Sequence, residues 1–378
     1  MRTIPASELA IHSDGSVFHL HLKPEQLADR VVLVGDPARV TTVASYFDSQ
    51  ECEVSSREFH TITGQYKGKR ITVVSHGIGT DNIDIVLNEL DALANIDFST
   101  RTIKPEFKQL SLVRIGTSGG LQPFVPIGTY VAAEKSIGFD GVIYFYANSN
   151  SVRDADLESE LIKQLDWRLS GIWPYVVSAD PSLIEQITRN DIIRGTTIAA
   201  NGFYGPQGRE LRLPLTDPEL NRKIEAFDYN GRKITNFEME SSSLAGLAAL
   251  MGHRAMTVCC IIAGRVDNHM NTDYKGSLEK LIETDTFEDS VEIDGNAVFD
   301  SAIKSAIIKN FIVSIELLHS GNENITGLPL SLENGICTVR QIDDYGCDDG
   351  VTSFVFNTAT QITINAKYEK LLSSLMNK

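Results

Sequence analysis

Short apolar runs alternate with polar and glycine-rich segments along most of the chain. Seven of these runs have the length and character of buried strands: 31–34, 71–74, 110–115, 129–132, 192–199, 234–237 and 255–262. Stretches with helical spacing of apolar residues lie between several of them. This alternation predicts an α/β fold, a three-layer sandwich in which helices flank a mixed central β-sheet.

The composition favours a soluble, cytoplasmic enzyme. Of 378 residues, 42% are hydrophobic, enough for a large core, and no run approaches the ~18 apolar residues of a membrane span. The N-terminus lacks the features of a signal peptide. The five cysteines, two of them adjacent, have the spacing of neither a disulfide framework nor a zinc site. A net charge of −16 argues against a nucleic-acid partner, because nucleic-acid phosphates need a basic face.

Segment 236–242 places two carboxylates and a thioether between a predicted strand and a predicted helix. Glu240 is well placed to begin that helix. Its carboxylate can accept hydrogen bonds from two sugar hydroxyls, while Met239 can pack against a ribose face. Considered alone, these residues are more simply explained as a charged helix start.

The end of the first apolar run carries groups suited to an anion. Gly35, Asp36 and Pro37 form a tight turn followed by a helix start. A glycine N–H and a helix N-terminus can both approach a phosphate closely, and Arg39 adds a fork of donors. An ordinary strand-turn-helix with a surface arginine explains this segment equally well.

A second strand end, after run 110–115, has similar character. The loop 116–120 offers backbone N–H groups and two hydroxyls to an oxyanion. Arg114 lies within the apolar strand end, where an unpaired charge is costly. Either a carboxylate or an anionic ligand must therefore neutralise it.

A third strand end precedes a loop of aromatic, glycine and proline residues. Gln207 can both donate and accept hydrogen bonds, and Arg209 can only donate. The two side chains could together meet the edge of a flat heterocycle, with Phe203 or Tyr204 against its face. The alternative is a polar surface turn with a buried aromatic anchor.

Together these motifs resemble the nucleoside phosphorylase-I superfamily. The resemblance covers roughly residues 16–270, and the Gln-x-Arg pair points to the branch that acts on uridine. It implies a reversible phosphorolysis in pyrimidine salvage, in which uridine and phosphate give uracil and ribose 1-phosphate. Inorganic phosphate would be the co-substrate, and no cofactor is implied.

The resemblance also implies roles for individual residues, given by position in this chain. The phosphate site would comprise Gly35, Arg39, Arg57, Arg114 and Thr117. The ribose site would comprise His19, Glu238, Met239 and Glu240. The base site would comprise Phe203, Gln207, Arg209 and Arg265. The groups expected to carry catalysis are Arg114, Arg209, Arg265 and Glu240.

Two of these residues, His19 and Arg57, would reach the site of a neighbouring subunit, so the resemblance implies at least a homodimer. Glu58, Ile78 and Asn82 match the positions of a potassium site found in some members, although a serine is usual where Asn82 stands. No other metal is implied.

The final third departs most from the superfamily pattern. We predict one domain over residues 1–320, with insertions near 96–109 and 268–295, in which apolar segment 297–319 supplies the last core helix. Residues 321–378 would be an extension of unknown role, packed on the core. The insertion at 96–109 and the extension could together block a hexameric ring and leave a dimer.

Four other functions remain open from the sequence. A purine phosphorylase is disfavoured because its base-protonating acid has no counterpart in 261–265, and Asp267 is a weak rival. Thymidine or deoxyuridine could also be substrates. A nucleosidase of the same fold would use water and need no arginine clamp. A non-catalytic nucleoside-binding relative would retain affinity without turnover.

Overall fold

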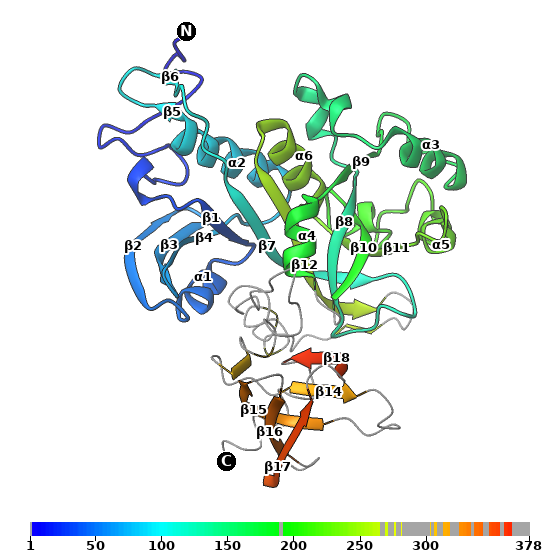
Figure 1. The fold of residues 1–378 in the computed structure, drawn as a ribbon. Helices are drawn as coiled ribbons and strands as arrows, with labels where there is room; N and C mark the ends of the chain where they lie inside the picture. Colours follow the sequence, from blue (N-terminus) through cyan, green and yellow to red (C-terminus); the bar gives the residue numbers. More distant parts are fainter. Residues whose placement is uncertain are drawn as a thin grey trace. The chain divides into compact units, whose positions relative to one another are not determined.

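The computed structural model describes residues 2–188 and 192–264 without a break. Beyond them it describes segments 269–270, 276, 281, 303, 306–307, 313–317, 325–333, 336–342, 348–355 and 359–364. The chain divides into two compact units, Met1–Glu288 and Asp289–Lys378 (Figure 1). No helix in the described part is long and apolar enough to cross a membrane.

The first unit is built on one mixed sheet. Its strands are β1 (Arg30–Val34), β2 (Ser49–Ser56), β3 (Phe59–Tyr66), β4 (Lys69–Ser75), β7 (Ser111–Gly120), β8 (Tyr130–Gly138), β9 (Tyr175–Ser178), β10 (Ile192–Ala199), β11 (Ile234–Glu238), β12 (Arg254–Gly264) and β13 (His269–Met270). They follow the order β13-β12-β8-β10-β11-β7-β1-β4-β3-β2, and β9 pairs with β8. Each of the seven predicted runs overlaps one of these strands. The edge strand β2 was not predicted, because its residues are exposed or half-buried throughout.

Part of this sheet closes on itself. Strand β7 pairs with β11 and β12, β12 pairs with β8, and β8 is joined to β11 through β10. The same β7 also runs parallel to β1 through its first half. Its second half is rich in glycine, and a Cβ on Gly120 would lie 2.4 Å from the carbonyl oxygen of Val125. The close approach of these two backbone segments therefore requires a residue without a side chain.

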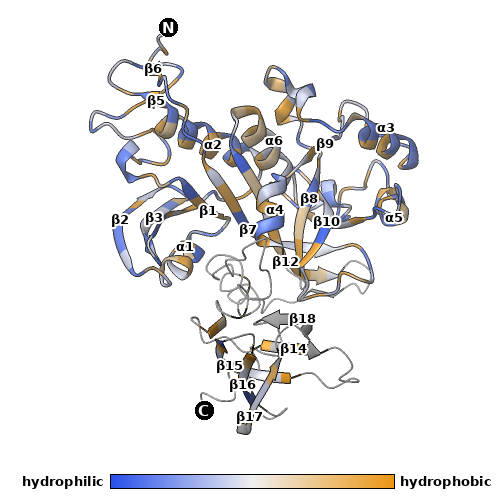
Figure 2. Cartoon of the chain, viewed as in Figure 1, coloured by the Kyte–Doolittle hydropathy of each residue, from blue (hydrophilic) through white to orange (hydrophobic). Residues whose placement is uncertain are grey.

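Helices cover both faces of the sheet, as predicted. They are α1 (Pro37–Ala44), α2 (Thr80–Asn95), α3 (Ala155–Gln164), α4 (Pro181–Ile187), α5 (Leu220–Ala226) and α6 (Ser241–Met251). One core packs α1 and α4 against Val32 and Val34, and another packs α2 and α6 against Val31 and Leu33. Alternate residues of β1 thus enter opposite cores, which explains its unbroken apolar run. Figure 2 shows the hydrophobic residues concentrated on β7, β12 and α6 in the middle of this unit.

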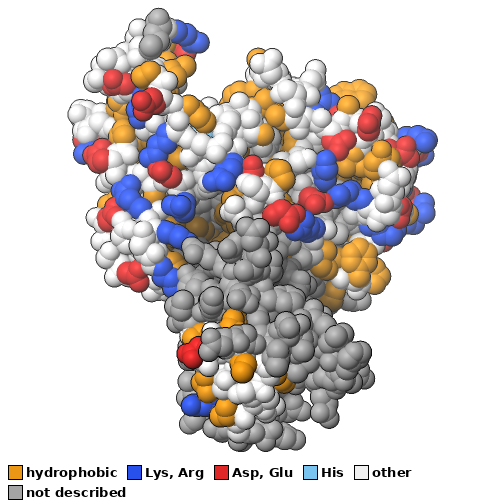
Figure 3. All heavy atoms as spheres, viewed as in Figure 1, with side chains coloured by type: hydrophobic (Ala, Val, Ile, Leu, Met, Phe, Trp, Pro, Cys, Tyr) orange, Lys and Arg blue, Asp and Glu red, His pale blue; other side chains and the backbone are white. Residues whose placement is uncertain are grey.

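Short elements complete the first unit. The segment predicted as an insertion forms a small hairpin, β5 (Ile96–Asp97) with β6 (Thr102–Ile103). Short 3₁₀ turns are found at Pro24–Gln26, Val142–Phe145, Ser149–Ser151 and Gly205–Gln207. On the face seen in Figure 3, Lys and Arg side chains are interspersed with Asp and Glu and form no broad basic surface.

The second unit contains an antiparallel sheet of order β17-β16-β15-β14-β18. The strands are β14 (Val313–Leu317), β15 (Ile325–Glu333), β16 (Ile336–Ile342), β17 (Asp348–Val355) and β18 (Ala359–Ile364). Its core includes Val313, Ile315, Cys337 and Val339, all fully buried.

This arrangement corrects the predicted treatment of segment 297–319. The division between the units falls after Glu288, so the segment belongs to the second unit and not to a domain ending at 320. Its end is a strand, β14, and not part of a long helix. The reason is visible in the sequence, because Val313, Ile315 and Leu317 alternate with Ser314 and Glu316 at the period of a strand.

Candidate functional site

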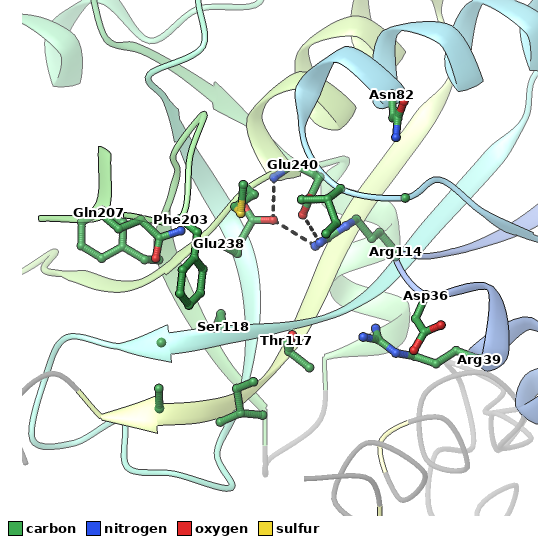
Figure 4. Close-up of a pocket in the computed structure, with 18 of the residues that line it drawn as sticks. Asp36, Arg39, Asn82, Arg114, Thr117, Ser118, Phe203, Gln207, Glu238 and Glu240 are labelled. Atoms are coloured by element: carbon green, nitrogen blue, oxygen red, sulfur yellow. Dashed lines mark hydrogen bonds and ion pairs between the residues drawn. The ribbon is translucent and has the colours of Figure 1, made fainter. Parts of the chain in front are cut away.

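A cavity of about 680 Å³ opens where β1, β7, β11 and β12 end (Figure 4). Ten of the thirteen residues predicted to bind substrate line it: Gly35, Arg39, Arg114, Thr117, Phe203, Gln207, Arg209, Glu238, Met239 and Glu240. Of the other three, His19 and Arg57 do not line it, and Arg265 lies outside the described residues, as does Asp267. The predicted strand ends therefore converge on one site.

Arg114 is at the centre of the buried charges in this cavity. The side chain is 5% exposed, and its Nη1 donates to Glu238 Oε2 at 2.9 Å while Nη2 donates to Glu240. Nη1 also approaches the Sγ atom of Cys259 at 3.7 Å, and burial raises the pKa of that thiol to about 12. Of the two alternatives that the sequence left open, carboxylates and not a ligand alone neutralise this arginine.

Arg114 can fold back along its strand only because residue 116 is glycine. A Cβ at Gly116 would lie 2.6 Å from Nη1 of Arg114, closer than any real contact. The guanidinium thus occupies the space that any other side chain at 116 would take. Segment 116–120, predicted as a loop, is in fact the second half of β7, and packing against Arg114 explains the glycine at 116 without anion binding.

Glu238 and Glu240 have different tasks at the start of α6. Glu238 accepts hydrogen bonds from the backbone N–H groups of Glu240 and Ser241, both at 2.9 Å, and from the Ser241 hydroxyl at 2.7 Å. The Glu238 side chain therefore satisfies the backbone N–H groups at the start of this helix. Glu240 immediately precedes the helix, as predicted, but its side chain turns to Arg114 and to the N–H of Gly79 at 2.7 Å.

The environment of Glu240 raises the pKa of its carboxyl above the ordinary value. Burial is the largest cause that raises the pKa of this carboxyl, and the charge of Glu238 raises it further. The charge of Arg114 acts in the opposite direction. Two carboxylates therefore share one guanidinium, an arrangement that leaves a net negative charge beside Met239 and is suited to accepting hydroxyl hydrogens.

Gln207, Arg209 and Phe203 form the far end of the cavity. Arg209 Nη1 donates to Gln207 Oε1 at 2.6 Å and also to the Phe203 carbonyl, and its Cζ lies 3.7 Å from the centre of the Phe203 ring. Gln207 is buried, and Asn221 Nδ2 donates to its backbone carbonyl at 3.1 Å. The structure thus brings Gln207, Arg209 and Phe203 together, with Phe203 stacked on the arginine, and their predicted contact with the edge of a heterocycle stays a prediction.

At the opposite end, β1 leads into α1 through the predicted tight turn. Asp36 caps the helix by accepting the N–H of Ala38 at 2.9 Å, and Pro37 occupies its first turn. Arg39, also in the first turn, lines the cavity together with Gly35 (Figure 4). The N-terminus of α1, Gly35 and Arg39 thus lie at this end, and Arg114 lines the same cavity. These groups together suit an oxyanion such as phosphate.

His19 and Arg57 lie together on the surface instead of in the cavity. The guanidinium of Arg57 is 5.6 Å from the ring of Phe18, which in turn meets the His19 ring edge-to-face at 4.9 Å. Glu89 on α2 fixes His19, since it accepts the backbone N–H at 2.9 Å and contacts Nδ1 at 2.7 Å. Neither side chain serves the cavity of its own chain.

Glu58, Ile78 and Asn82 do line the cavity, gathered around Gly77. Gly77 has a φ of +73°, and a Cβ on it would lie 2.4 Å from Asn82 Nδ2 and 3.2 Å from Glu58 Cγ. The close turn at this glycine brings the three residues to one wall. Within the described part of the chain, no three His, Cys, Asp or Glu side chains gather as a metal site would require.

His76 is a further buried residue beside Arg114, and it is not among the residues predicted from the sequence. It directly follows β4, which runs beside β1 with Ser75 opposite Val34, so His76 ends its strand level with Gly35. Its Nε2 accepts the Nε–H of Arg114 at 3.1 Å. A polar residue at the end of a second apolar strand was the signal that could have identified it.

Comparison with known proteins agrees with this geometry. The family model described as "Phosphorylase superfamily" matches residues 29–303. A uridine phosphorylase from Thermococcus kodakarensis is 32% identical over 261 residues, covering 68% of this chain and 80% of that protein. A DeoD-type purine nucleoside phosphorylase from Tolumonas auensis is 24% identical over 282 residues, covering 73% of this chain and 95% of that protein.

A solved structure supports the same assignment. A nucleoside phosphorylase from Trypanosoma brucei, whose crystal structure is described as showing uridine phosphorylase activity, matches with a TM-score of 0.66 at 30% identity. The match covers 72% of this chain and 96% of that one. With a family match over more than half of its length, and with the family's motifs gathered around one cavity, this chain belongs to the phosphorylase superfamily.

Proposed function

We propose that this protein is a uridine phosphorylase, a pentosyltransferase that converts uridine and inorganic phosphate into uracil and ribose 1-phosphate. The observation that carries the proposal is the layout of the cavity (Figure 4). Arg39 lies at one end and Gln207 at the other, and Gly35, Arg209, Met239 and Glu240 line the cavity with them. An anion, a sugar and a heterocycle can therefore bind in the order in which they occur in the reaction.

The charges in the cavity fit cleavage of the bond between sugar and base. As that bond breaks, positive charge develops on the ribose and negative charge on the uracil oxygens. Arg209, preorganised by Gln207 and Phe203, is placed to stabilise the departing uracil anion, with Arg265 as a second proposed donor. Phosphate held by Arg39 and Arg114 then forms the new bond to the sugar carbon, so most of the catalysis is positioning and electrostatics.

Glu240 would bind the ribose in this scheme. Each of its oxygens already accepts one hydrogen bond, from Gly79 or from Arg114, and retains capacity for a sugar hydroxyl. Met239 beside it would pack on the sugar face. Because a deoxyribose offers one hydroxyl fewer, the carboxylate would be left under-satisfied, and we expect uridine to be preferred over deoxyuridine.

The site of one chain is incomplete under this proposal. His19 and Arg57 would approach the sugar and phosphate bound by a partner, so the active form is at least a homodimer. The observation in favour is that the two side chains lie close together on the surface and outside their own cavity. The proposal further includes a cytoplasmic location and a role in pyrimidine salvage.

A monovalent cation fits the wall around Gly77. Glu58, Ile78 and Asn82 offer a carboxylate, a backbone carbonyl and an amide oxygen, the oxygen donors that hard cations prefer. We propose that potassium there would hold the turn and take no part in the bond cleavage. Exchanging potassium for tetramethylammonium at constant ionic strength should lower the melting temperature, whereas an unchanged melting temperature would contradict the site.

The experiment that tests the function is a uridine cleavage assay with and without inorganic phosphate, with inosine and thymidine in parallel. We expect phosphate-dependent release of uracil and little release of hypoxanthine. Release that does not need phosphate would identify a nucleosidase instead. Preference for inosine would mean that Gln207 and Arg209 do not read a pyrimidine edge, and binding without turnover would identify a non-catalytic relative.

A further inference from the structure

His76 is the third side chain, after those of Glu238 and Glu240, that forms a close hydrogen bond with Arg114. The imidazole is fully buried, and its Nε2 lies 3.1 Å from the Nε of Arg114, which donates the hydrogen bond. Its backbone N–H is anchored on the carbonyl of Val34 at 2.9 Å, and its Cε1 would be 3.8 Å from a Cβ on Gly35. The ring therefore reaches from the end of β4 past Gly35, which follows β1, to Arg114 on β7.

The imidazole must be neutral to make this contact. Since Arg114 can only donate, Nε2 must keep its lone pair, and the ring proton must reside on Nδ1. Burial, followed by the charges of Arg114 and Arg39, holds the pKa of His76 well below its usual value. The hydrogen bond from Arg114 and the lowered pKa of His76 thus both indicate a neutral ring with its proton on Nδ1.

Packing alone does not explain a histidine here. Its Nδ1 is buried and has no hydrogen-bond partner among the described residues. A buried N–H without a partner is unfavourable, and an apolar side chain of similar size would avoid the loss. The acceptor at Nε2 is the property that an apolar replacement could not supply.

The contact leaves Arg114 with a defined remaining donor. Nε is used by His76, Nη1 by Glu238 and Cys259, and one hydrogen of Nη2 by Glu240. Of the five N–H groups of the guanidinium, one on Nη2 is left by these contacts for a ligand in the cavity that Arg114 lines.

We propose that His76 is a positioning residue that fixes the guanidinium of Arg114 for phosphate, acting as a neutral hydrogen-bond acceptor. This inference rests on the proposed phosphorolysis and deepens its phosphate site. If the acceptor is lost, Nε–H is left unpaired in a buried site, and the guanidinium gains freedom to turn away from Glu240 and the cavity. The reacting phosphate would then lose a preorganised donor.

Three substitutions separate this role from packing. His76→Gln places an amide oxygen near the position of Nε2, His76→Asn reaches only the level of Nδ1, and His76→Leu removes both. We expect kcat/KM for phosphate to fall about a hundredfold in the Leu variant, the effect typical of one lost donor. The KM for phosphate should rise more than that for uridine. The Gln variant should recover about tenfold over Leu, and the Asn variant should not.

His253 supplies a matched control. It is also buried, but its Nδ1 accepts the N–H of Leu110 and its Nε2 contacts Asp91, both at 3.1 Å, away from the cavity. His253→Leu should lower the melting temperature and leave the KM for phosphate unchanged. Wild-type kinetics in His76→Leu, or equal impairment of the Gln and Asn variants, would overturn the proposal.

The role of His76 can still be tested if a variant does not fold or if the protein does not cleave uridine. If His76→Leu does not fold, the Gln and Asn pair carries the comparison. If the wild-type protein does not cleave uridine, the proposed function fails, and positioning is measured by the rise in melting temperature that inorganic phosphate produces. That rise should be larger in wild type and His76→Gln than in His76→Asn, and equal rises would refute the role of His76.

Discussion

A glycine decides where the central arginine lies. In a Gly116→Ala variant, the added methyl would enter the space of the Arg114 guanidinium, 2.6 Å from Nη1. We expect the arginine to shift away from Glu238 and Glu240, with a loss of kcat/KM of about a hundredfold. Steady-state kinetics on purified protein measures this loss.

The matched control is Gly276→Ala, an exposed position where an added Cβ would meet no atom of the described residues within 4 Å, apart from those of its chain neighbours and its own helix. It should leave kcat/KM unchanged. A Gly116→Ala enzyme with normal activity would show that Arg114 is not held as described, and equal losses in the two variants would point to a general effect on folding.

The raised pKa of Glu240 predicts how ribose binding depends on pH. The ionised carboxylate accepts sugar hydroxyls, so the KM for uridine should rise as the pH falls through this raised pKa, at a higher pH than the ordinary value of 4.5 would give. Because the folded pKa is raised, the contribution of Glu240 to stability is complete below pH 4.5 and is lost as the pH rises through the folded value.

Two measurements check these opposite trends. The KM for uridine is followed against pH, and the free energy of unfolding is compared between wild type and Glu240→Gln across the same range. The stability of the wild type relative to the variant should fall as the pH rises. A relative stability that increases with pH would contradict a raised pKa, and a pH-independent KM would remove Glu240 from ribose binding.

At the scale of single residues, the sequence predicted polar side chains that stand near glycines or helix starts next to apolar runs. Arg114, Gln207 and Glu240 stand beside glycines or at helix starts, where polar groups are expected to face a ligand. His76 was missed because its partner, Arg114, is 38 positions away in the chain. A pairing of that kind arises only when the sheet is assembled, because β1 lies between the strands β4 and β7 that bring the two side chains together.

At the scale of elements, the hairpin β5–β6 forms hydrogen bonds that hold the N-terminal arm, residues 2–12, in place. Arg101 at its turn donates from Nε to the carbonyl of Ile4 at 2.8 Å and from Nη2 to those of Pro5 and Leu9, and its own carbonyl accepts the N–H of Ile4. The arm leads directly to His19. The segment predicted as an insertion is thus the anchor of a segment that is proposed to contribute to the partner's site.

An Arg101→Ala variant should release this arm. We expect faster hydrogen exchange in residues 2–12, because the donors that hold three backbone carbonyls are lost while the core is untouched. Exchange measured by mass spectrometry reports it. Arg168→Ala, which removes an exposed ion pair with Asp166, is the control and should leave the arm protected. Unchanged exchange in residues 2–12 would show that the hairpin does not hold the arm.

Such an anchor is not readable from sequence patterns. Periodicity identifies the faces of helices and strands, but the bonds between Arg101 and the arm join side chain to backbone across 97, 96 and 92 positions. Asp97 gives a local hint, since it accepts the N–H of Ser99 at 2.8 Å and so marks a turn. The residues that this turn contacts are determined by the tertiary structure and cannot be inferred from the local sequence.

At the scale of the molecule, the apolar runs were sufficient to predict an α/β fold with a mixed sheet, because buried strands between helices leave a strong local signal. Closure of the sheet through β7 and β12 was not predictable from them, since strand order is set by packing. The end of the first unit, predicted at residue 320, was also misplaced. The apolar spacing of 297–319 fits a helix, and only the alternation within 313–317 indicates a strand.

The proposed sharing of sites between subunits gives the most direct test at this scale. Arg57→Ala would damage the site of the partner, whereas Arg114→Ala would damage the site of its own chain. Each pure variant should therefore be nearly inactive. In a symmetric dimer that contains one chain of each kind, one site has lost both arginines, but the other keeps Arg114 from its own chain and Arg57 from its neighbour.

Mixing the two variants should accordingly restore activity. If the chains are unfolded and refolded together, half of the dimers are mixed and half of their sites are intact, so about a quarter of the wild-type activity is expected. Refolding each variant alone is the control and should restore none. A mixture no more active than the average of its components would mean that Arg57 acts within its own chain or not at all, and the surface formed by Phe18, His19 and Arg57 would then need another explanation.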